Sequence, residues 1–342
     1  MANVKKKAIR STSKSTWNAQ DDTSRQISLI ITTKNETRTI SELLESIANQ
    51  TRIPDEIIIS DASEINSKLQ IPNFKRLHIR LIHIDSSANR SVGRNTAIAN
   101  AKHEHILITD AGCKLKDDWV EQMMKGFSQK QLKERDPSLF AQDDKILVVA
   151  GFYEGTFATI FEQCEIPYAL VMPDKLDTKN FLPATRSMGI TKTAWKKLGG
   201  FNENYRYAED YDFAKRIQSS KMRIAVVPEA IVYWRPRKNL FSFAKMISEH
   251  AYGDAYAGNW RPKVGLIYVR YGIFLALFLL SLSTIFGLFF FVQIVFAYIS
   301  FSIVKNYRYV RHWKAMLYLP VLQVVSDIAV MWGALLGFLS KK

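Results

Sequence analysis

The sequence contains very few cysteines. Of its 342 residues only Cys113 and Cys164 are cysteines, and no C-x-x-C pair occurs. This spacing argues against a zinc site. A lone thiol is most often a small buried residue, which is the role expected for Cys113. Two cysteines in a chain of this length also suit a reducing compartment.

Two further patterns are missing. No G-x-G-x-x-G fingerprint follows the first expected strand, at residues 27–31, which argues against a dinucleotide-binding dehydrogenase. The basic run at residues 5–7 is followed by Ser, Thr and Asn rather than by an apolar region, so it does not resemble a secretory signal. Residues 1–25 are polar, and we expect them to form a disordered tail.

Acidic residues are scarce toward both ends of the chain. The net charge is +15, and residues 261–342 carry nine Lys or Arg against one acidic residue. Residues 1–26 carry six against two, so the intervening body is close to neutral. A nucleic-acid-binding protein more often carries its basic excess on the folded body. Basic ends that flank apolar segments instead favour a lipid bilayer as the partner. We therefore expect that the protein does not bind nucleic acid.

Long apolar runs occupy the C-terminal part. Residues 264–304 contain one charge, Arg270, and would form roughly 60 Å of helix where one crossing needs about 30 Å. We therefore predict two spans, near 264–283 and 284–304, that turn at residues 281–284. A third stretch, near 316–339, is either another span or an interfacial helix. Its Asp327 must face protein, and Gly333 and Gly337 form a possible close-packing face.

The basic residues lie on the same side of the two predicted spans. Arg261 and Lys263 precede the first span, and the basic segment 305–314 follows the second. The positive-inside rule then places both flanks, and the preceding domain, in the cytoplasm. We predict a multi-pass cell-membrane protein with a membrane region at 263–342 and an interfacial helix or linker at 241–262.

Residues 26–240 show the alternation of an α/β domain. Apolar strand patterns at 27–31, 57–59, 78–84 and 106–108 alternate with helical periodicity at 40–47 and 90–101. This order predicts a mostly parallel sheet with helices on both faces.

Polar residues follow three of these strands. Each alone can be a helix cap or turn residue, but together they predict a ligand crevice, because parallel strands end at the same sheet edge. A helix that begins with Gly93, Arg94 and Asn95 adds a cation and backbone donors for phosphate. The set suits a nucleotide with a diphosphate, and comprises Thr32, Lys34, Asn35, Glu36, Asp61, Arg94 and Asp110.

Two later segments carry charge. Glu209 and Asp210 open a helix, where acids either complement the helix dipole or act as a general base toward a substrate hydroxyl. Arg235 and Arg237 lie in a cationic run at 234–238. They either stabilise a leaving diphosphate or form a basic surface beside the membrane.

These motifs, in this order, resemble the inverting family 2 glycosyltransferases of the GT-A fold. The first strand and its loop resemble that family's base-binding segment, and the strand ending in Asp61 resembles the one whose aspartate contacts the base. The helix carrying Arg94 resembles the one that approaches the nucleotide. Residues 106–112 resemble the strand that carries the Asp-x-Asp metal motif. Asp210 matches the catalytic base as the second acid of the Glu209-Asp210 pair.

The resemblance implies a nucleotide-sugar donor and a lipid-linked or glycan acceptor. It also implies a divalent metal, Mg²⁺ or Mn²⁺, on Asp110, although Gly112 replaces the second acid of the metal motif. A catalytically inactive membrane scaffold that keeps the fold is an alternative supported by Gly112. A processive polysaccharide synthase is another, but no Gln-x-x-Arg-Trp sequence follows Asp210.

Overall fold

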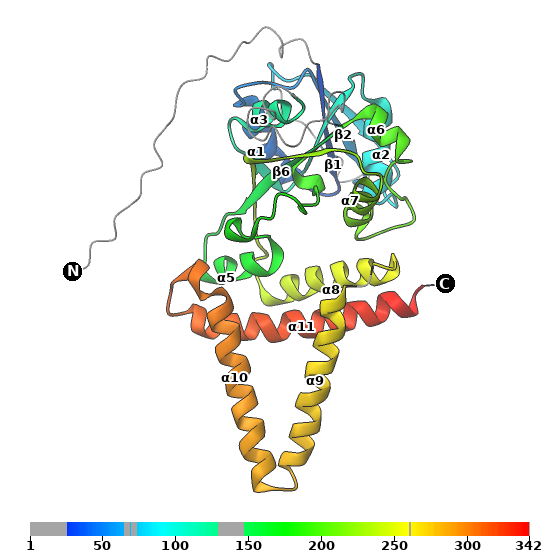
Figure 1. Ribbon diagram of the computed structural model, residues 1–342. Coiled ribbons are helices and arrows are strands. Elements are labelled where there is room, and N and C mark those ends of the chain that lie inside the picture. Colours follow the sequence, from blue (N-terminus) through cyan, green and yellow to red (C-terminus); the bar gives the residue numbers. More distant parts are fainter. Residues whose placement is uncertain (1–25, 65–68, 70–73, 129–146, 260, 342) are drawn as a thin grey trace, which may run out of the picture.

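The computed structural model describes residues 26–64, 69, 74–128, 147–259 and 261–341. The predicted tail, residues 1–25, lies outside them. An α/β domain stands above two long projecting helices (Figure 1). Its eight strands follow the order β3-β2-β1-β4-β7-β6-β8-β5. They are β1 (Ile27–Thr33), β2 (Glu56–Asp61), β3 (Ile79–His83), β4 (His105–Asp110), β5 (Cys113–Leu115), β6 (Val148–Gly155), β7 (Met188–Thr191) and β8 (Ile224–Trp234).

The strands β3, β2, β1 and β4 form the parallel half of the sheet. The apolar side chains of β1, β2 and β4 are buried on both faces, as expected for strands covered by helices, whereas those of the edge strand β3 are only partly buried. The register aligns Thr33 with Asp61 and Thr32 with Asp110. The carboxyl ends of β1, β2 and β4 therefore meet at one edge, which confirms the predicted mixed, mostly parallel sheet and the shared strand edge.

The second half of the sheet contains antiparallel pairs, which the resemblance to the GT-A fold implies but the strand and helix pattern alone does not. β7 is only four residues long and pairs antiparallel with both β4 and β6. β8 continues through Pro228, where the pairing with β6 shifts register between Gly151 and Phe152. Such a shift tolerates a residue without a backbone N–H. The segment before β7 is thereby fixed beside the end of β4.

Five helices within the described part of the domain cover the sheet. They are α1 (Thr37–Ala48), α2 (Arg90–Asn100), α3 (Trp119–Gly126), α6 (Lys192–Lys197) and α7 (Glu209–Ser219). One core contains Leu43 of α1 and Trp119 of α3, whereas the other contains Ala97 of α2, Ala194 of α6 and Phe213 of α7. The helix α5 (Ile160–Ala169) lies below, toward the membrane part, and begins with a Thr159–Glu162 capping box.

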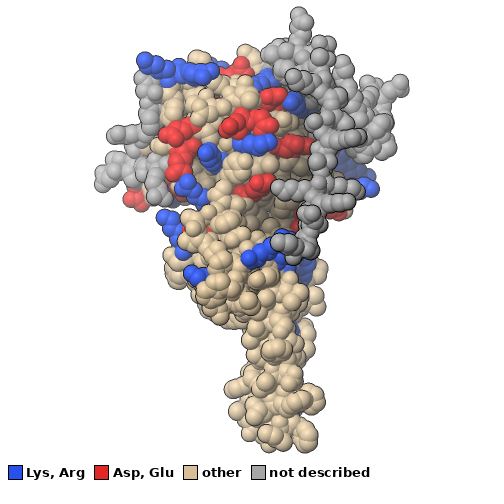
Figure 2. All heavy atoms as spheres, turned by 90° about the vertical axis from the view of Figure 1, so that its left-hand side faces the viewer, with Lys and Arg blue, Asp and Glu red and all other residues tan. Residues whose placement is uncertain are grey.

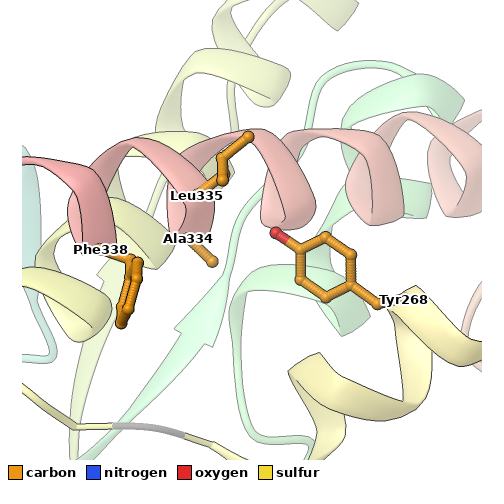
Figure 3. Close-up of a pocket in the computed structure, with 4 residues that line it drawn as sticks. All are labelled: Tyr268, Ala334, Leu335 and Phe338. Carbon is orange, nitrogen blue, oxygen red and sulfur yellow. The ribbon is translucent and has the colours of Figure 1, made fainter.

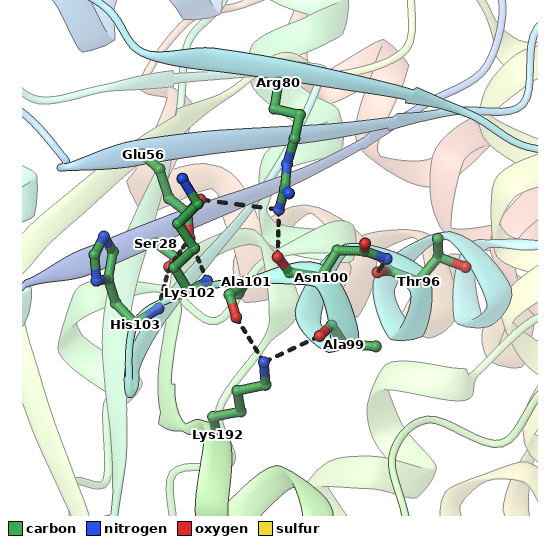
Figure 4. Close-up of polar contacts among 10 residues, drawn as sticks. All are labelled: Ser28, Glu56, Arg80, Thr96, Ala99, Asn100, Ala101, Lys102, His103 and Lys192. Atoms are coloured by element: carbon green, nitrogen blue, oxygen red, sulfur yellow. Dashed lines mark hydrogen bonds and ion pairs between the residues drawn. The ribbon is translucent and has the colours of Figure 1, made fainter.

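Polar contacts fasten the C-terminus of α2 at the amino end of the strands (Figure 4). Lys192 Nζ donates to the carbonyl oxygens of Ala99 and Ala101, at 3.0 and 2.6 Å, and so occupies carbonyls that the helix end leaves open. Arg80 donates to the carbonyl of Asn100 and lies 3.9 Å from Glu56. These contacts fix one end of α2, whose other end reaches the opposite sheet edge.

The C-terminal helices are α8 (Leu240–Tyr256), α9 (Pro262–Ser281), α10 (Ile285–Val310) and α11 (Ala315–Leu339). The last three are long and apolar enough to cross a membrane. α9 and α10 project as a hairpin that turns at the predicted residues 281–284, while α8 and α11 run side by side beneath the domain (Figure 1). In Figure 2 the projecting stem shows no Lys, Arg, Asp or Glu over most of its length.

Glycines bring α11 into close contact with α8. A Cβ atom on Gly333 would lie 2.1 Å from the carbonyl oxygen of Ser248, and one on Gly337 would lie 2.3 Å from that of Tyr252. The predicted close-packing face of the GxxxG motif therefore contacts α8. α11 thus packs lengthwise on α8, whereas α9 and α10 project away from the domain (Figure 1).

Asp327 joins three of the C-terminal helices. It lies on α11, is buried, and accepts hydrogen bonds from Arg270 of α9 at 2.5 Å and from Gln323 at 3.1 Å. Tyr298 of α10 also donates to it. The prediction that this acid faces protein is thus confirmed. An unpaired charge would be costly in an apolar environment, so the network holds α9, α10 and α11 together.

An apolar pocket of about 440 Å³ lies between α9 and α11 (Figure 3). Tyr268, Ala334, Leu335 and Phe338 line it. The Tyr268 hydroxyl donates to the carbonyl oxygen of Met331 at 2.6 Å, so its polar end is satisfied within the helix pair. The pocket is therefore suited to an apolar group such as a hydrocarbon chain.

We predict that Gly333→Ala destabilises the protein by about 1–3 kcal/mol, because the new methyl group overlaps the α8 backbone. The matched control is Gly272→Ala on α9, where no heavy atom lies within 4 Å of the added Cβ. That control should be neutral or stabilising, since Ala favours a helix over Gly by about 1 kcal/mol. Thermal unfolding of the detergent-solubilised variants measures both. Equal melting temperatures would contradict the close α8–α11 contact.

Candidate functional site

Arg94 on α2 connects two acids that lie far apart in the sequence. Its Nη1 donates to Glu209 Oε1 at 2.7 Å, and its Nη2 donates to Asp110 Oδ1 at 3.0 Å. The guanidinium is only 2% exposed and lies over the ring of Phe201. The two carboxylates raise the pKa of Arg94 above its usual value, although burial acts in the opposite direction. The sheet edge and the start of α7 are therefore held together by one buried cation.

The surroundings of Arg94 explain why α2 lies so close to the sheet. A Cβ on Gly93 would lie 3.1 Å from Thr32 Cγ2, so the glycine permits a close approach of α2 to β1. Asn89 caps the helix by accepting from Val92 N at 3.1 Å. Asn95 donates to the carbonyl of Phe201 at 2.8 Å, which ties α2 to the segment preceding α7.

Asp110 combines a fixed position with access to solvent. Its side chain is 39% exposed, although one oxygen is held by Arg94. Burial raises the pKa of Asp110, but the positive charges of Arg94, Arg186 and Arg90 outweigh this, and its pKa lies below the usual value. The carboxylate therefore stays ionised in a positively charged surrounding.

The two acids at the start of α7 differ in environment. Glu209 is 3% exposed and is bound to Arg94, whereas Asp210 is partly exposed and accepts from Tyr211 N at 2.8 Å. Successive helical positions are about 100° apart, so the two acids point in different directions. Ala208 enters the helix with a left-handed φ of 59°. Of the pair, Asp210 is the acid free to meet a substrate.

Asp61 lies at the expected strand end but is fully buried. Its Oδ1 accepts from Ser63 Oγ at 2.6 Å and its Oδ2 lies 3.4 Å from His83 Nδ1. Ser63 Oγ in turn accepts from Asn35 N at 2.8 Å. Asp61 therefore braces the loop that carries the predicted base-binding residues.

The remaining residues of that loop lie at the surface. Lys34 donates to the carbonyl of Ser86 at 2.6 Å, which joins the loops after β1 and β3. Asn35 has a left-handed φ of 57°. Glu36 accepts from Thr39 Oγ1 and precedes α1. Thr32 is partly buried against α2. The loop is thus shaped by contacts from both neighbouring strand ends.

The two arginines of the cationic run are exposed and differ in their contacts. Arg235 forms an ion pair with Glu42 of α1 at 2.7 Å. Arg237 donates its backbone N–H to Glu165 at 2.8 Å, and its charge acts on His250 of α8. Arg235 is therefore already paired at the surface, whereas Arg237 acts electrostatically on α8.

Three basic side chains near the acids were absent from the sequence-based set. Arg186 and Arg90 both act electrostatically on Asp110. The pKa of His250 on α8 is lowered by desolvation and by Arg186, Arg90 and Arg237, against the opposing charge of Asp210. No spacing pattern marks these residues, because each comes from a different element. The helix α8 thus brings a titratable group into electrostatic range of Asp210.

The residues at this edge offer few ligands to a metal ion. Gly112 has no side chain, and no heavy atom lies within 4 Å of where its Cβ would be. Within the described part of the chain, no three His, Cys, Asp or Glu side chains are grouped as metal ligands. Asp110 therefore supplies one carboxylate, itself bound to Arg94, and the described residues at this edge offer a metal ion an incomplete set of ligands.

Comparisons with known proteins identify relatives of this chain. Residues 28–132 match the family described as glycosyl transferase family 2. The chain is 25% identical over 239 residues to a poly(ribitol-phosphate) beta-glucosyltransferase of Bacillus spizizenii, covering 61% of this chain and 35% of that protein. It is 29% identical over 212 residues to the uncharacterised glycosyltransferase YwdF of Bacillus subtilis, covering 61% and 74%. The chain thus spans about a third of the first relative's length.

A solved structure extends the similarity to the C-terminal part. The mannosyltransferase PcManGT from Pyrobaculum calidifontis, in complex with GDP-Man and Mn²⁺, superposes with a TM-score of 0.62. The match covers 91% of this chain and 89% of that chain at 16% identity. At this identity the likeness establishes the fold, which is of the GT-A type.

We predict that the stability of the protein falls as the pH rises toward 7 because of Glu165. This residue of α5 is fully buried, and desolvation raises its pKa to about 7, although the backbone N–H of Arg237 opposes the shift. The folded-state pKa exceeds the unfolded value of about 4.5, so the folded protein binds this proton more tightly. The favourable contribution is complete below about pH 4.5 and is lost as the pH rises to about 7.

Replacing Glu165 by Gln removes this loss. The variant should gain up to about 3 kcal/mol of stability relative to the wild type between pH 5 and pH 8. Chemical denaturation across that pH range measures the difference, with Glu45→Gln on the exposed side of α1 as the matched carboxyl-to-amide control. A Glu165→Gln difference that varies with pH no more than that of the control would refute the prediction.

Proposed function

Because the chain belongs to glycosyltransferase family 2 and has the GT-A fold, we propose that it transfers a sugar from a nucleotide-sugar donor to an acceptor hydroxyl with inversion. The observation that carries the proposal is the Arg94 bridge, which joins Asp110 at the end of β4 to the Glu209-Asp210 pair of α7. A donor held at the strand edge then lies beside the acid that takes the acceptor proton. The fold and the family support this arrangement.

The proposed reaction assigns different tasks to the two acids of α7. Asp210 accepts the proton of the acceptor hydroxyl, whose oxygen forms a bond to the anomeric carbon. The bond from that carbon to the diphosphate breaks, and the diphosphate leaves with the electron pair. Glu209 touches no substrate in this scheme. It is a positioning residue that holds Arg94, because its carboxylate is buried and paired.

The proposed donor site lies along the ends of β1, β2 and β4. Thr32, Lys34, Asn35 and Glu36, supported by Asp61, would contact the base. A donor with a diphosphate would extend past Asp110 toward the positive groups of the site. Asp110 would meet the ribose, or a Mg²⁺ or Mn²⁺ ion bound to the donor. Among the described residues at this edge, Asp110 is the carboxylate that such an ion would meet, and the proposed proton transfer uses the chain's own Asp210.

We also propose that the acceptor is lipid-linked or a membrane-bound glycan, used at the cytoplasmic face. The N-terminus of α9 and the C-terminus of α10, with their basic residues, both lie on the side of the domain (Figure 1). The positive-inside rule then places the domain in the cytoplasm. The helix α8, which carries His250 near Asp210, runs along the base of the domain. An acceptor anchored in the bilayer would therefore reach the site over a short path.

We predict that Asp210→Asn lowers transfer by about 10²–10⁴-fold while donor binding stays within about threefold of the wild type, because only the base is lost. The measurement is a screen of UDP- and GDP-sugars for hydrolysis or transfer by the membrane fraction, followed by donor titration of the purified protein. Asp212→Asn is the matched control. Asp212 lies in the same helical turn and is paired with Arg216 at 2.9 Å, so transfer should persist.

Glu209→Gln separates positioning from base catalysis. It should weaken donor binding and lower the melting temperature, because it leaves Arg94 buried with one carboxylate fewer. Full transfer by Asp210→Asn would rule out Asp210 as the base. A wild-type protein that binds no nucleotide-sugar, with or without Mn²⁺, would favour the inactive scaffold instead.

A further inference from the structure

We propose that Arg186 is the principal protein cation for the donor's diphosphate, and that it stabilises the negative charge on the leaving group. This inference rests on the proposed function and identifies a residue outside the sequence-based set. It also accounts for the incomplete metal motif, since a guanidinium neutralises phosphate charge without a second carboxylate.

The backbone of Arg186 is fixed directly beside Asp110. Thr109, the residue before Asp110, donates its hydroxyl to the Arg186 carbonyl oxygen at 2.9 Å. The next residue, Ser187, accepts from Trp119 Nε1 at 2.8 Å and donates to the Ala230 carbonyl. The short helical turn at Thr185–Ser187 is thus held from three sides, so the position of Arg186 is settled before any ligand binds.

The guanidinium of Arg186 lies between two aromatic rings and retains hydrogen-bonding capacity. Its Cζ lies 5.1 Å from the ring centre of Tyr153 and 5.7 Å from that of Trp234. Its Nη1 is shielded from water yet has no hydrogen-bond partner within the described residues. A buried donor without a partner is costly, and a ligand oxygen would remove that cost. The aromatic rings hold the guanidinium without neutralising its charge.

The other arginines of the site are either paired with carboxylates or exposed at the surface. Arg94 is committed to two carboxylates, and Arg235 is paired at the surface with Glu42. Arg90 acts on the same Asp110 from the first position of α2, and it is exposed. A diphosphate beside Asp110 would therefore meet the Arg186 guanidinium, with Arg90 and the start of α2 as further positive groups.

In the transfer step, the bond between the anomeric carbon and the diphosphate oxygen breaks, and the electron pair stays on that oxygen. Arg186 donates hydrogen bonds to the diphosphate as this charge develops and is itself unchanged. The acceptor proton goes to Asp210. A purely structural Arg186 would instead only link β6 to β8 through Tyr153 and Trp234.

The test measures UDP and UMP binding to the full-length protein in detergent, with EDTA and again with Mn²⁺, and uses GDP and GMP if UDP does not bind. Arg186→Gln should weaken binding of the diphosphate at least 10-fold in both conditions, and that of the monophosphate less than threefold. Arg186→Lys keeps the charge but loses the bidentate geometry of the guanidinium, so its UDP affinity should lie between those of Arg186→Gln and the wild type. Arg76→Gln, an exposed arginine in the turn before β3, is the matched control.

Equal binding of UDP by Arg186→Gln and the wild type would overturn the proposal for Arg186 and leave the proposed function intact. An equal loss for UMP and UDP, with a lower melting temperature, would assign Arg186 to structure alone. If Arg186→Gln does not fold, the test compares the UDP-to-UMP affinity ratio of Arg186→Lys with that of the wild type. An unchanged ratio overturns the proposal. A wild type that binds no nucleotide would instead contradict the proposed function itself.

Discussion

The interaction between Arg94 and its two carboxylates is the contact on which the site depends. Arg94, Asp110 and Glu209 come from α2, the end of β4 and the start of α7, and they meet where the guanidinium is almost completely buried. Removing one partner of such a buried charge pair typically costs about 3–5 kcal/mol, because the other charge stays desolvated. The three elements therefore reach their relative positions together, and the edge of the sheet is fixed with respect to α7 before a substrate arrives.

This contact also separates the tasks of neighbouring acids. Glu209 is buried and paired with Arg94, whereas Asp210 is partly exposed. At Asp110 one oxygen is held, while more than a third of the side chain stays exposed. The remaining positive charge near Asp110 comes from Arg186 and Arg90. With Arg186 and Arg90 acting on Asp110, this edge of the sheet favours an anionic ligand.

The sequence was sufficient for features that depend on local pattern. The apolar strands ending near Thr32, Asp61 and Asp110 were predictable because each run is short, buried and followed by polar residues. The hairpin of α9 and α10 was predictable from length and hydropathy. Burial of Arg94 and exposure of Asp110 were not, because they follow from contacts 16 and 115 residues away in sequence. Arg186 was missed for a similar reason: it lies in the three-residue turn Thr185–Ser187, and its neighbours Tyr153 and Trp234 are distant in sequence.

A continuous set of close contacts links the membrane helices to the proposed base. Asp327 ties α11 to both projecting helices, and Gly333 sets α11 against α8 without a side chain between them. At the other side of α8, a Cβ on Gly253 would lie 2.6 Å from the backbone carbon of Tyr207, which precedes α7. Because closely packed backbones leave few voids between them, a displacement of one helix also moves its neighbour. The orientation of α8 therefore constrains the start of α7, and with it the carboxylate of Asp210.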